Sequence, residues 1–262
     1  MFTCEDLVQP TSVAEAYRLL GERPDNTLIG GGAFLRIGGK KIGTAIDLSR
    51  LGLDYIRETD GWFELGAMAT FRAVETYRPF RECFGGLLPQ AVGNVIGVQF
   101  RNLVTVGASV YAKFGFSDLI TALLVLETEV ELYKGGRLPL GEFLARPFPR
   151  DILTRLYIAR DGRRAAYRSL RNSASDFPLI NAAASCHEGR WLIAVGARPL
   201  KAEIARTASA AMGEPGAEPA AVAAMAADEL AFSGNNKASA AYRKAMAAVM
   251  VKRAVEGVLA CD

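Results

Sequence analysis

The stretch Asn26–Gly39, NTLIGGGAFLRIGG, places three consecutive glycines at positions 30–32 directly after a short apolar run. Consecutive glycines cost backbone entropy on folding and contribute no side-chain packing, so a folded chain needs a physical reason to keep them together. We predict a short strand over the apolar run that leads into the triplet. The triplet itself is then a loose linker, a tight turn, or a place where the backbone comes very close to a ligand.

The triplet does not match the two best-known phosphate-binding motifs. A dinucleotide-binding GxGxxG needs glycines at its first, third and sixth positions, whereas Ala33, Phe34 and Leu35 follow the triplet. The chain also lacks a P-loop, in which GxxxxGK is followed by Ser or Thr. On this stretch alone, a flexible surface loop is the favoured interpretation.

A second turn of small residues changes that interpretation. It lies in RNLVTVGASVYAKFGFSD (residues 101–118), and its members are Thr105, Val106, Gly107, Ala108 and Ser109. Main-chain N–H groups beside small side chains can form a nest that binds an anion. Two such turns facing each other would hold a pyrophosphate, and Asp118 would accept a hydrogen bond from a sugar or ribityl hydroxyl. Helix capping beside Ser117 is the alternative role for Asp118.

Turn signals and hydrophobic periodicity predict an α+β fold. Ser12 with Glu15 predicts a capped amphipathic helix that ends at Gly21. Asp60-Gly61 and Gly135-Gly136 each predict a hairpin, and Ser117 is expected to cap a buried helix. From about residue 163 onward, the pattern predicts an antiparallel sheet with a turn at His187–Arg190, covered by about three helices.

Composition narrows the possible functions. The chain has 262 residues, of which 50% are hydrophobic and 23% charged, and its net charge is +3. Lys and Arg are scattered along the chain, so a nucleic-acid surface is not expected. No apolar stretch reaches the roughly 18 residues that a membrane span needs. Residues 1–20 lack the basic and apolar regions of a secretory signal.

The cysteines and the histidine argue against a metal centre in this chain. Four cysteines (Cys4, Cys83, Cys186 and Cys261) lie far apart and form no CxxC pair, so we expect free thiols in a reducing cytoplasm. The single histidine, His187, excludes a His-rich metal site and argues against a Ser-His-Asp triad. We therefore expect a bound cofactor to carry any redox chemistry.

The two turns resemble motifs of the FAD-binding subunit, or middle domain, of the molybdenum hydroxylases. That group includes relatives of xanthine, carbon monoxide and nicotinate dehydrogenases and belongs to the vanillyl-alcohol-oxidase-like flavoproteins. The family's first motif, A-G-G-T/Q-D/S-L, corresponds to Gly30–Leu35. Its second, R-N-x-x-T-I-G-G-N/S followed by an Asp, corresponds to Arg101–Ser109 and Asp118.

The resemblance continues along the chain in the same order. The family's ALLALDAEVEL is similar to ALLVLETEVEL at residues 122–132. Residues 165–185 resemble its F-x-K-x-x-x-R segment, and residues 238–258 resemble its terminal S-A-x-Y-R helix. Each motif is weakly specific by itself, but the ordered set spans essentially the whole chain.

The resemblance implies an α+β fold in three parts. A two-part FAD-binding domain would cover residues 1–160, with a small α/β subdomain at 1–56 and a larger mixed-sheet subdomain at 57–160. A C-terminal α+β domain would cover residues 161–262, with an antiparallel sheet and about three helices.

The resemblance also implies a set of cofactor-binding residues. Both turns would wrap the FAD pyrophosphate, and Asp118 would bind cofactor hydroxyls. Ile152 or Leu153 would pack near the isoalloxazine, and Arg168 would stand where relatives often have a Lys that faces the flavin. The complete set is Leu28, Ile29, Gly30, Gly31, Gly32, Ala33, Phe34, Leu35, Val95, Thr105, Val106, Gly107, Ala108, Ser109, Asp118, Ile152, Leu153 and Arg168.

As a member of this family, the chain would be the electron exit of a larger oxidoreductase and would hold no catalytic or metal-binding residue itself. Its partners would be a molybdopterin-binding large subunit and a [2Fe–2S] small subunit. Electrons would reach FAD from the [2Fe–2S] centres and pass to NAD or another acceptor. The composition and the dispersed cysteines described above predict a cytoplasmic protein with no membrane span and no nucleic-acid partner.

Some positions depart from the family pattern. Ala33 and Phe34 replace a polar pair, Ala108 replaces a glycine, and Asn235 replaces an Asp. Because main-chain donors survive these changes, FAD binding is expected. The same fold without flavin, acting as an assembly or regulatory subunit, is the alternative. A generic α+β binding module would require the ordered matches to be accidental.

Overall fold

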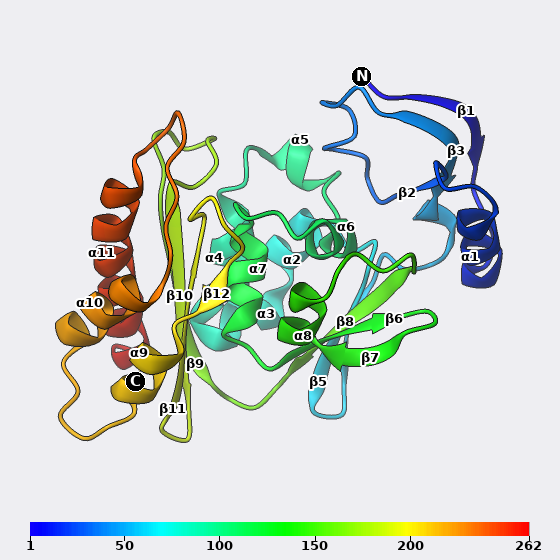
Figure 1. Ribbon diagram of the computed structural model, residues 1–262. Coiled ribbons are helices and arrows are strands. Elements are labelled where there is room, and N and C mark those ends of the chain that lie inside the picture. The colour runs from blue at the N-terminus through cyan, green and yellow to red at the C-terminus, as the bar shows by residue number, and fades with distance from the viewer. Residues whose placement is uncertain (262) are drawn as a thin grey trace. The chain divides into compact units, whose positions relative to one another are not determined.

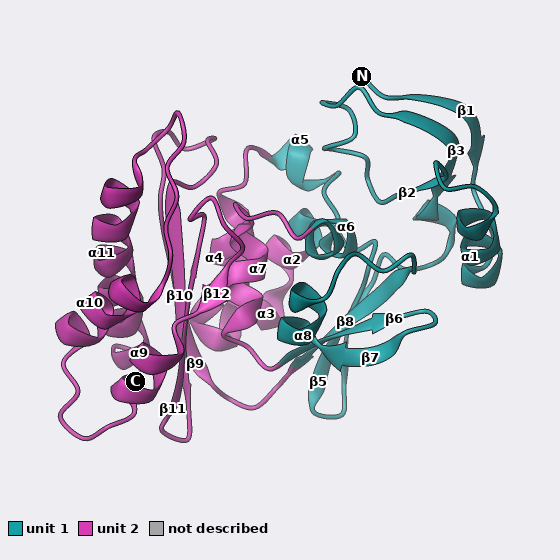
Figure 2. Ribbon diagram, viewed as in Figure 1, with its two compact units in different colours: residues 1–73, 98–112, 128–158 teal, residues 74–97, 113–127, 159–262 magenta. Residues whose placement is uncertain are grey.

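The computed structural model describes residues 1–261, and these form two compact units (Figure 1, Figure 2). Unit 1 comprises residues 1–73, 98–112 and 128–158, and unit 2 comprises the remaining segments. Residues 74–97 and 113–127, which the sequence analysis assigned to the FAD-binding domain, thus pack with the C-terminal residues. The division into domains at residue 160 stays a prediction.

A small parallel sheet in unit 1 carries the glycine triplet. Its strands lie in the order β1-β3-β2, and helix α1 packs on it through Ala16 and Leu20. Ser12 caps this helix by accepting a hydrogen bond from the Glu15 main-chain N–H at 3.1 Å, so the predicted cap is confirmed. The elements are β1 (Thr3–Val8), α1 (Val13–Glu22), β2 (Thr27–Ile29) and β3 (Lys41–Asp47), followed by the short helix η1 (Leu48–Arg50).

A five-stranded sheet in the order β4-β5-β8-β6-β7 forms the rest of the unit 1 framework. Both predicted hairpins are confirmed, and their turn glycines Gly61 and Gly136 have positive φ values of 72° and 67°. The strands are β4 (Ile56–Thr59), β5 (Trp62–Gly66), β6 (Thr128–Leu132), β7 (Gly136–Pro139) and β8 (Leu153–Ala159). The accompanying helices are α2 (Phe71–Thr76, which runs into unit 2), α5 (Val98–Arg101), α6 (Val106–Ala112) and α8 (Leu140–Ala145).

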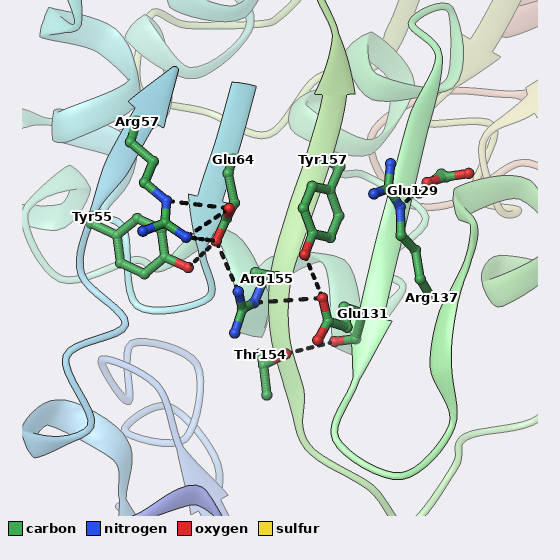
Figure 3. A network of polar contacts seen from close by, with 9 residues as sticks. All are labelled: Tyr55, Arg57, Glu64, Glu129, Glu131, Arg137, Thr154, Arg155 and Tyr157. Carbon is green, nitrogen blue, oxygen red and sulfur yellow. Dashed lines mark hydrogen bonds and ion pairs between the residues drawn. The ribbon is translucent and has the colours of Figure 1, made fainter. Parts of the chain in front are cut away.

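A network of charged and aromatic side chains lies across β4, β5, β8 and β6 (Figure 3). Its centre is Glu64, which is 4% exposed and accepts hydrogen bonds from Tyr55, Arg57 and Arg155. Burial alone would raise the pKa of Glu64, but these donors lower it overall. Burial and the bond to Glu64 raise the pKa of Tyr55 to about 12. The buried Glu64 carboxylate on β5 thus links β4 and β8, because Arg57 and Arg155 on those strands donate hydrogen bonds to its oxygens.

We predict that Glu64→Gln destabilises the protein by about 2 kcal/mol at neutral pH, because it removes the charge that compensates two arginines. The pKa of Glu64 is lowered in the folded state, so its contribution is full above the ordinary glutamate pKa of about 4.3 and is lost as the pH falls below it. Urea unfolding from pH 7 to pH 3 measures both effects.

The exposed Glu82, paired with Arg78 at 2.7 Å, provides the control Glu82→Gln, with an expected change below about 0.5 kcal/mol in the free energy of unfolding. Equal losses in both variants would contradict the prediction.

Unit 2 is built on an antiparallel sheet in the order β12-β11-β10-β9. The turn predicted at His187–Arg190 is confirmed, and Glu188 and Gly189 have φ values of +49° and +78°. The strands are β9 (Arg164–Leu170), β10 (Ile180–His187), β11 (Arg190–Gly196) and β12 (Glu203–Ile204).

Helices cover both faces of the unit 2 sheet (Figure 1). Three helices pack on one face over a core that includes Ile193, Val222 and Val251, as the sequence predicted. They are α9 (Arg206–Met212), α10 (Pro219–Glu229) and α11 (Ala240–Leu259). The other face carries α4 (Leu87–Gly93) and α7 (Asp118–Leu124), and α3 (Arg78–Glu82) and η2 (Phe84–Gly86) complete the unit. The predicted α+β fold class is confirmed.

Asn235, one of the departures from the family pattern, binds a buried arginine. Arg243 is 2% exposed and donates hydrogen bonds to the Leu179 and Ala197 carbonyl oxygens and to Oδ1 of Asn235 at 2.7 Å. Burial lowers the pKa of Arg243. The amide of Asn235 therefore helps to hold the start of α11 against the loops after β11 and before β10.

Among residues 1–261, no helix combines the length and the apolar character needed to cross a lipid bilayer.

Candidate cofactor site

The glycine triplet forms a tight turn at the end of β2 in unit 1. Gly31 and Gly32 have φ values of +72° and +66°, a region that favours glycine. A Cβ atom on Gly31 would lie 1.7 Å from the main-chain oxygen of Leu103, and one on Gly30 would lie 2.9 Å from Oγ1 of Thr105. The turn is therefore a close backbone approach, and the interpretation as a flexible surface loop is wrong.

The glycine turn at residues 30–32 lies against the second turn, as predicted from the sequence. Oγ1 of Thr105 donates a hydrogen bond to the Gly30 carbonyl oxygen at 3.3 Å. Gly107 has the same need for space, because its Cβ would lie 2.5 Å from Cβ of Ala67. Ala108 replaces a family glycine but lies in the regular helix α6, and its φ is not positive. The substitution is thus accommodated without backbone strain.

The main-chain N–H groups of the second turn are used within the protein. Those of Val106 and Gly107 donate to the Ala69 and Ala67 carbonyl oxygens, each at 2.8 Å. Those of Ala108 and Ser109 donate to Thr105, at 3.4 Å to Oγ1 and at 3.1 Å to the carbonyl oxygen. The N–H groups of residues 106–109 thus all have protein acceptors, and the anion-binding nest expected at residues 107–109 stays a prediction.

The first turn retains free donors. Within residues 1–261, the main-chain N–H groups of Gly31, Gly32 and Ala33 donate to no protein acceptor, and all three residues are only half-buried. Successive free N–H groups in a turn with glycines at positive φ can form an anion-binding nest, so these three groups are candidate donors to an external acceptor. Ser109 adds a half-buried hydroxyl without a protein partner in the same part of the chain.

Phe34, which replaces a polar residue of the family's first motif, has a packing role. Its ring meets the ring of Phe100 on α5 edge to face, with centroids 6.4 Å apart. Residues 33–38 form turns in which the Arg36 N–H donates to the Gly32 carbonyl oxygen at 3.2 Å. The aromatic contact therefore anchors the segment that follows the glycines.

Asp118 lies in unit 2 at the first position of α7, with Ser117 as the cap. Its carboxylate is 5% exposed; it accepts hydrogen bonds from Tyr167 and from Asn181 (3.1 Å) and pairs with Arg171 at 2.8 Å. Burial, with the nearby Asp118 charge, raises the pKa of Tyr167 well above its ordinary value. Local sequence did not reveal these three partners, which come from β9 to β10, and the role of Asp118 toward FAD stays a prediction.

The other site residues predicted in unit 2 lie elsewhere on it. Arg168 belongs to the face of β9 covered by α11, where a Cβ on Gly257 would lie 2.8 Å from its Nη2. Tyr167 and Asp118 lie on the opposite face, so the sheet separates Arg168 from Asp118. Val95 is half-buried after α4, and its N–H donates to the Val92 carbonyl oxygen. The roles of Arg168 and Val95 toward the flavin stay predictions.

Ile152 and Leu153 are core residues of unit 1. Ile152 is 0% exposed and packs with Ala16, Leu20 and Ile46 beneath the small sheet. Leu153 is 4% exposed in β8. Both side chains thus belong to the core, and their packing near the isoalloxazine stays a prediction.

A family comparison identifies the chain. The model of the FAD binding domain in molybdopterin dehydrogenase matches residues 2–160, more than half of the protein. The chain belongs to this family. It is an FAD-binding subunit of the molybdenum hydroxylases, a flavoprotein oxidoreductase component whose cofactor is FAD.

Curated relatives and solved structures agree with the family. The chain is 29% identical over 192 residues to the uncharacterized protein YgfM of Escherichia coli (strain K12), covering 71% of each protein. It is 31% identical over 130 residues to the nicotinate dehydrogenase FAD-subunit of Eubacterium barkeri, covering 47% of the chain and 44% of the relative. The reconstituted CO dehydrogenase from Oligotropha carboxidovorans shows the same fold with a TM-score of 0.88 at 23% identity, over 99% of both chains. CO dehydrogenase from Hydrogenophaga pseudoflava that lacks the Mo-pyranopterin moiety gives a TM-score of 0.87 at 25% identity, over 97% of both.

We predict that Gly31→Ala weakens FAD binding more than tenfold, because its Cβ would force the turn away from Leu103 and misplace main-chain donors worth about 1.5–3 kcal/mol each to a charged group. Titration of FAD with the apoprotein measures the affinity, and far-UV circular dichroism checks the fold. Gly39→Ala is the matched control, because its Cβ meets no atom within 4 Å. Equal FAD affinity in the two variants would show that the turn does not hold the phosphates.

Proposed function

We propose that this chain is the FAD-binding electron-transfer subunit of a multisubunit molybdenum hydroxylase. In this proposal a [2Fe–2S] small subunit delivers electrons that a molybdopterin-binding large subunit has taken from the substrate. NAD or another acceptor receives them from FAD. The family match supports the proposal, as do the FAD-subunit name of one relative and the CO dehydrogenase names of the structural neighbours.

The single observation that carries the proposal is the row of unpartnered N–H groups at Gly31, Gly32 and Ala33. Main-chain donors in a glycine turn suit a pyrophosphate, which has several oxygens and needs a close backbone approach. We assign these three donors to the pyrophosphate and add the Ser109 hydroxyl. The second turn then supports the first through Thr105 rather than contributing its own N–H groups.

The chain itself binds and orients the cofactor. Bound FAD would supply the one- and two-electron chemistry that the side chains lack. For Asp118 of unit 2, whose carboxylate is held by Tyr167, Asn181 and Arg171, a role toward cofactor hydroxyls is implied by the family resemblance alone. All four cysteines are free thiols, which suits the proposed cytoplasmic location.

We predict that the purified protein is yellow, with an oxidised-flavin spectrum, or becomes so when FAD is added. Absorption spectra with and without added FAD measure this, and a FAD-specific result is checked against FMN, which lacks the pyrophosphate linkage. A protein that stays colourless and does not bind FAD in a titration would contradict the proposed function. That result would leave the alternative role as an assembly or regulatory subunit.

The electron-transfer part of the proposal has its own test. Chains that co-purify with the native protein are expected to include one with [2Fe–2S] centres and one that binds molybdopterin. In the assembled complex, electrons from the reduced iron–sulfur centres should bleach the visible absorption of the oxidised flavin. If the protein is yellow but forms no such complex, the assignment of FAD as its cofactor stands and the electron-transfer role is contradicted.

A further inference from the structure

The side chain of Thr105 lies against the first two glycines of the triplet, within unit 1. Its Oγ1 donates a hydrogen bond to the Gly30 carbonyl oxygen at 3.3 Å, and a Cβ atom on Gly30 would lie 2.9 Å from this Oγ1. Its Cγ2 lies 3.5 Å from the position that a Cβ on Gly31 would take. The absence of side chains at both glycines therefore lets the threonine side chain reach the turn.

The main chain around Thr105 is held in place on both sides. Thr105 is 2% exposed. The Val106 N–H after it donates to the Ala69 carbonyl oxygen at 2.8 Å. The Val104 carbonyl oxygen before it accepts from the Phe71 N–H at 2.9 Å. A β-branched side chain on a fixed backbone has little rotameric freedom, so the Thr105 hydroxyl is a fixed point for the glycine turn.

The two hydrogen bonds of the Thr105 hydroxyl determine where its proton points. A carbonyl oxygen can only accept, so the single hydroxyl proton goes to Gly30. The Ala108 N–H can only donate, and it occupies a lone pair of the same hydroxyl oxygen at 3.4 Å. The pyrophosphate of FAD presents acceptor oxygens, and the hydroxyl has no second proton for them. Any effect of Thr105 on a bound pyrophosphate therefore passes through Gly30.

The bond to Gly30 also sets the direction of the next N–H group. The peptide between Gly30 and Gly31 is planar and trans, so its carbonyl oxygen and its N–H point in opposite directions. Because Thr105 binds the oxygen, the Gly31 N–H points away from Thr105, and within residues 1–261 it donates to no protein acceptor. The first of the three free donors is thus aimed away from the hydroxyl that binds its peptide.

Without this bond, the orientation of the Gly30–Gly31 peptide would be poorly defined. Glycine adopts positive and negative φ about equally readily, so a peptide between two glycines can turn over at little cost. In the reversed state the carbonyl oxygen, rather than the N–H, would face the phosphates and repel them. A ligand that binds one of two states has an apparent affinity reduced by the fraction of molecules in the competent state.

We propose that Thr105 is a positioning residue for FAD, which keeps the Gly30–Gly31 peptide in the orientation that presents the Gly31 N–H to the pyrophosphate. This role rests on the proposed function, because it takes the pyrophosphate as the acceptor for that N–H. The second turn then contributes a hydroxyl that selects the binding-competent state of the first turn.

Replacement of the hydroxyl in the full-length apoprotein tests this role by FAD titration. Thr105→Val keeps the shape of the side chain, and we expect the affinity for FAD to fall about fivefold, the effect of one hydrogen bond. Thr105→Ser keeps the hydroxyl and should restore most of the affinity. Thr44→Val is the matched control, because Thr44 lies half-buried in β3 and its hydroxyl forms no hydrogen bond within residues 1–261.

Two further measurements distinguish positioning from a loss of stability. The phosphorus NMR signals of bound FAD should shift in the valine variant but not in the serine variant, which a change in stability alone would not produce. In a Gly31→Ala background, Thr105→Val should have little further effect, because the displaced turn no longer aims its donors. Thr105→Ala should repeat the loss of affinity and replaces the valine variant if valine is not tolerated. Far-UV circular dichroism and urea unfolding check each fold.

Several outcomes would overturn the proposal. They are a valine variant that binds FAD as tightly as the wild type, a serine or Thr44→Val variant that loses as much affinity, and additive losses from Thr105→Val and Gly31→Ala. If Gly31→Ala weakens FAD binding and Thr105→Val does not, the proposed function stands and only the role of Thr105 is contradicted. A wild-type protein that binds no FAD contradicts both.

Discussion

The close approach of Gly31 to the main-chain oxygen of Leu103 is the constraint on which the candidate site depends. It joins a turn at the edge of the small parallel sheet to the segment between α5 and α6, although more than 70 residues separate them in the sequence. No side chain larger than hydrogen fits there, and Thr105 adds a hydrogen bond to Gly30. The glycines therefore allow the two segments to pack closely, and the shape of the resulting turn leaves the N–H groups of Gly31, Gly32 and Ala33 free.

This packing divides the roles of the two turns. The second turn is buried at Thr105, Val106 and Gly107, and its N–H groups are paired with residues 67–69 and with its own first turn of helix. The first turn is half-buried and unpaired at Gly31–Ala33. In the proposed function, the second turn thus supports the first, and the first turn supplies the donors to the pyrophosphate. Both turns were expected to contribute main-chain donors, because a sequence pattern shows where small side chains lie but not which N–H groups remain free of protein acceptors.

Local features of the fold were largely predictable from the sequence. The cap at Ser12, the hairpin at Asp60-Gly61 and the turn at His187–Arg190 each depend on residues within a few positions of one another. Strand β1 was missed, because it is exposed along most of its length and shows no apolar alternation; its pairing with β3 alone defines it. The partners of Asp118 were missed for the same kind of reason, since Tyr167 and Asn181 lie 49 and 63 residues away. Resemblance to a family supplied the cofactor and the position of the two turns, but it did not show that Arg168 faces α11.

The departures at Ala33 and Phe34 fit a site that works through its backbone. A polar pair at these positions would offer side-chain bonds to phosphate, yet such bonds add to main-chain donors and do not replace the turn that aims them. Phe34 instead packs on Phe100, which fixes the far end of the turn on α5 while Leu103 and Thr105 fix the near end. A turn held at both ends loses less conformational freedom when a ligand binds, and that lowers the entropic cost of binding. The apolar replacement therefore exchanges direct contacts for preorganisation of the same three N–H groups.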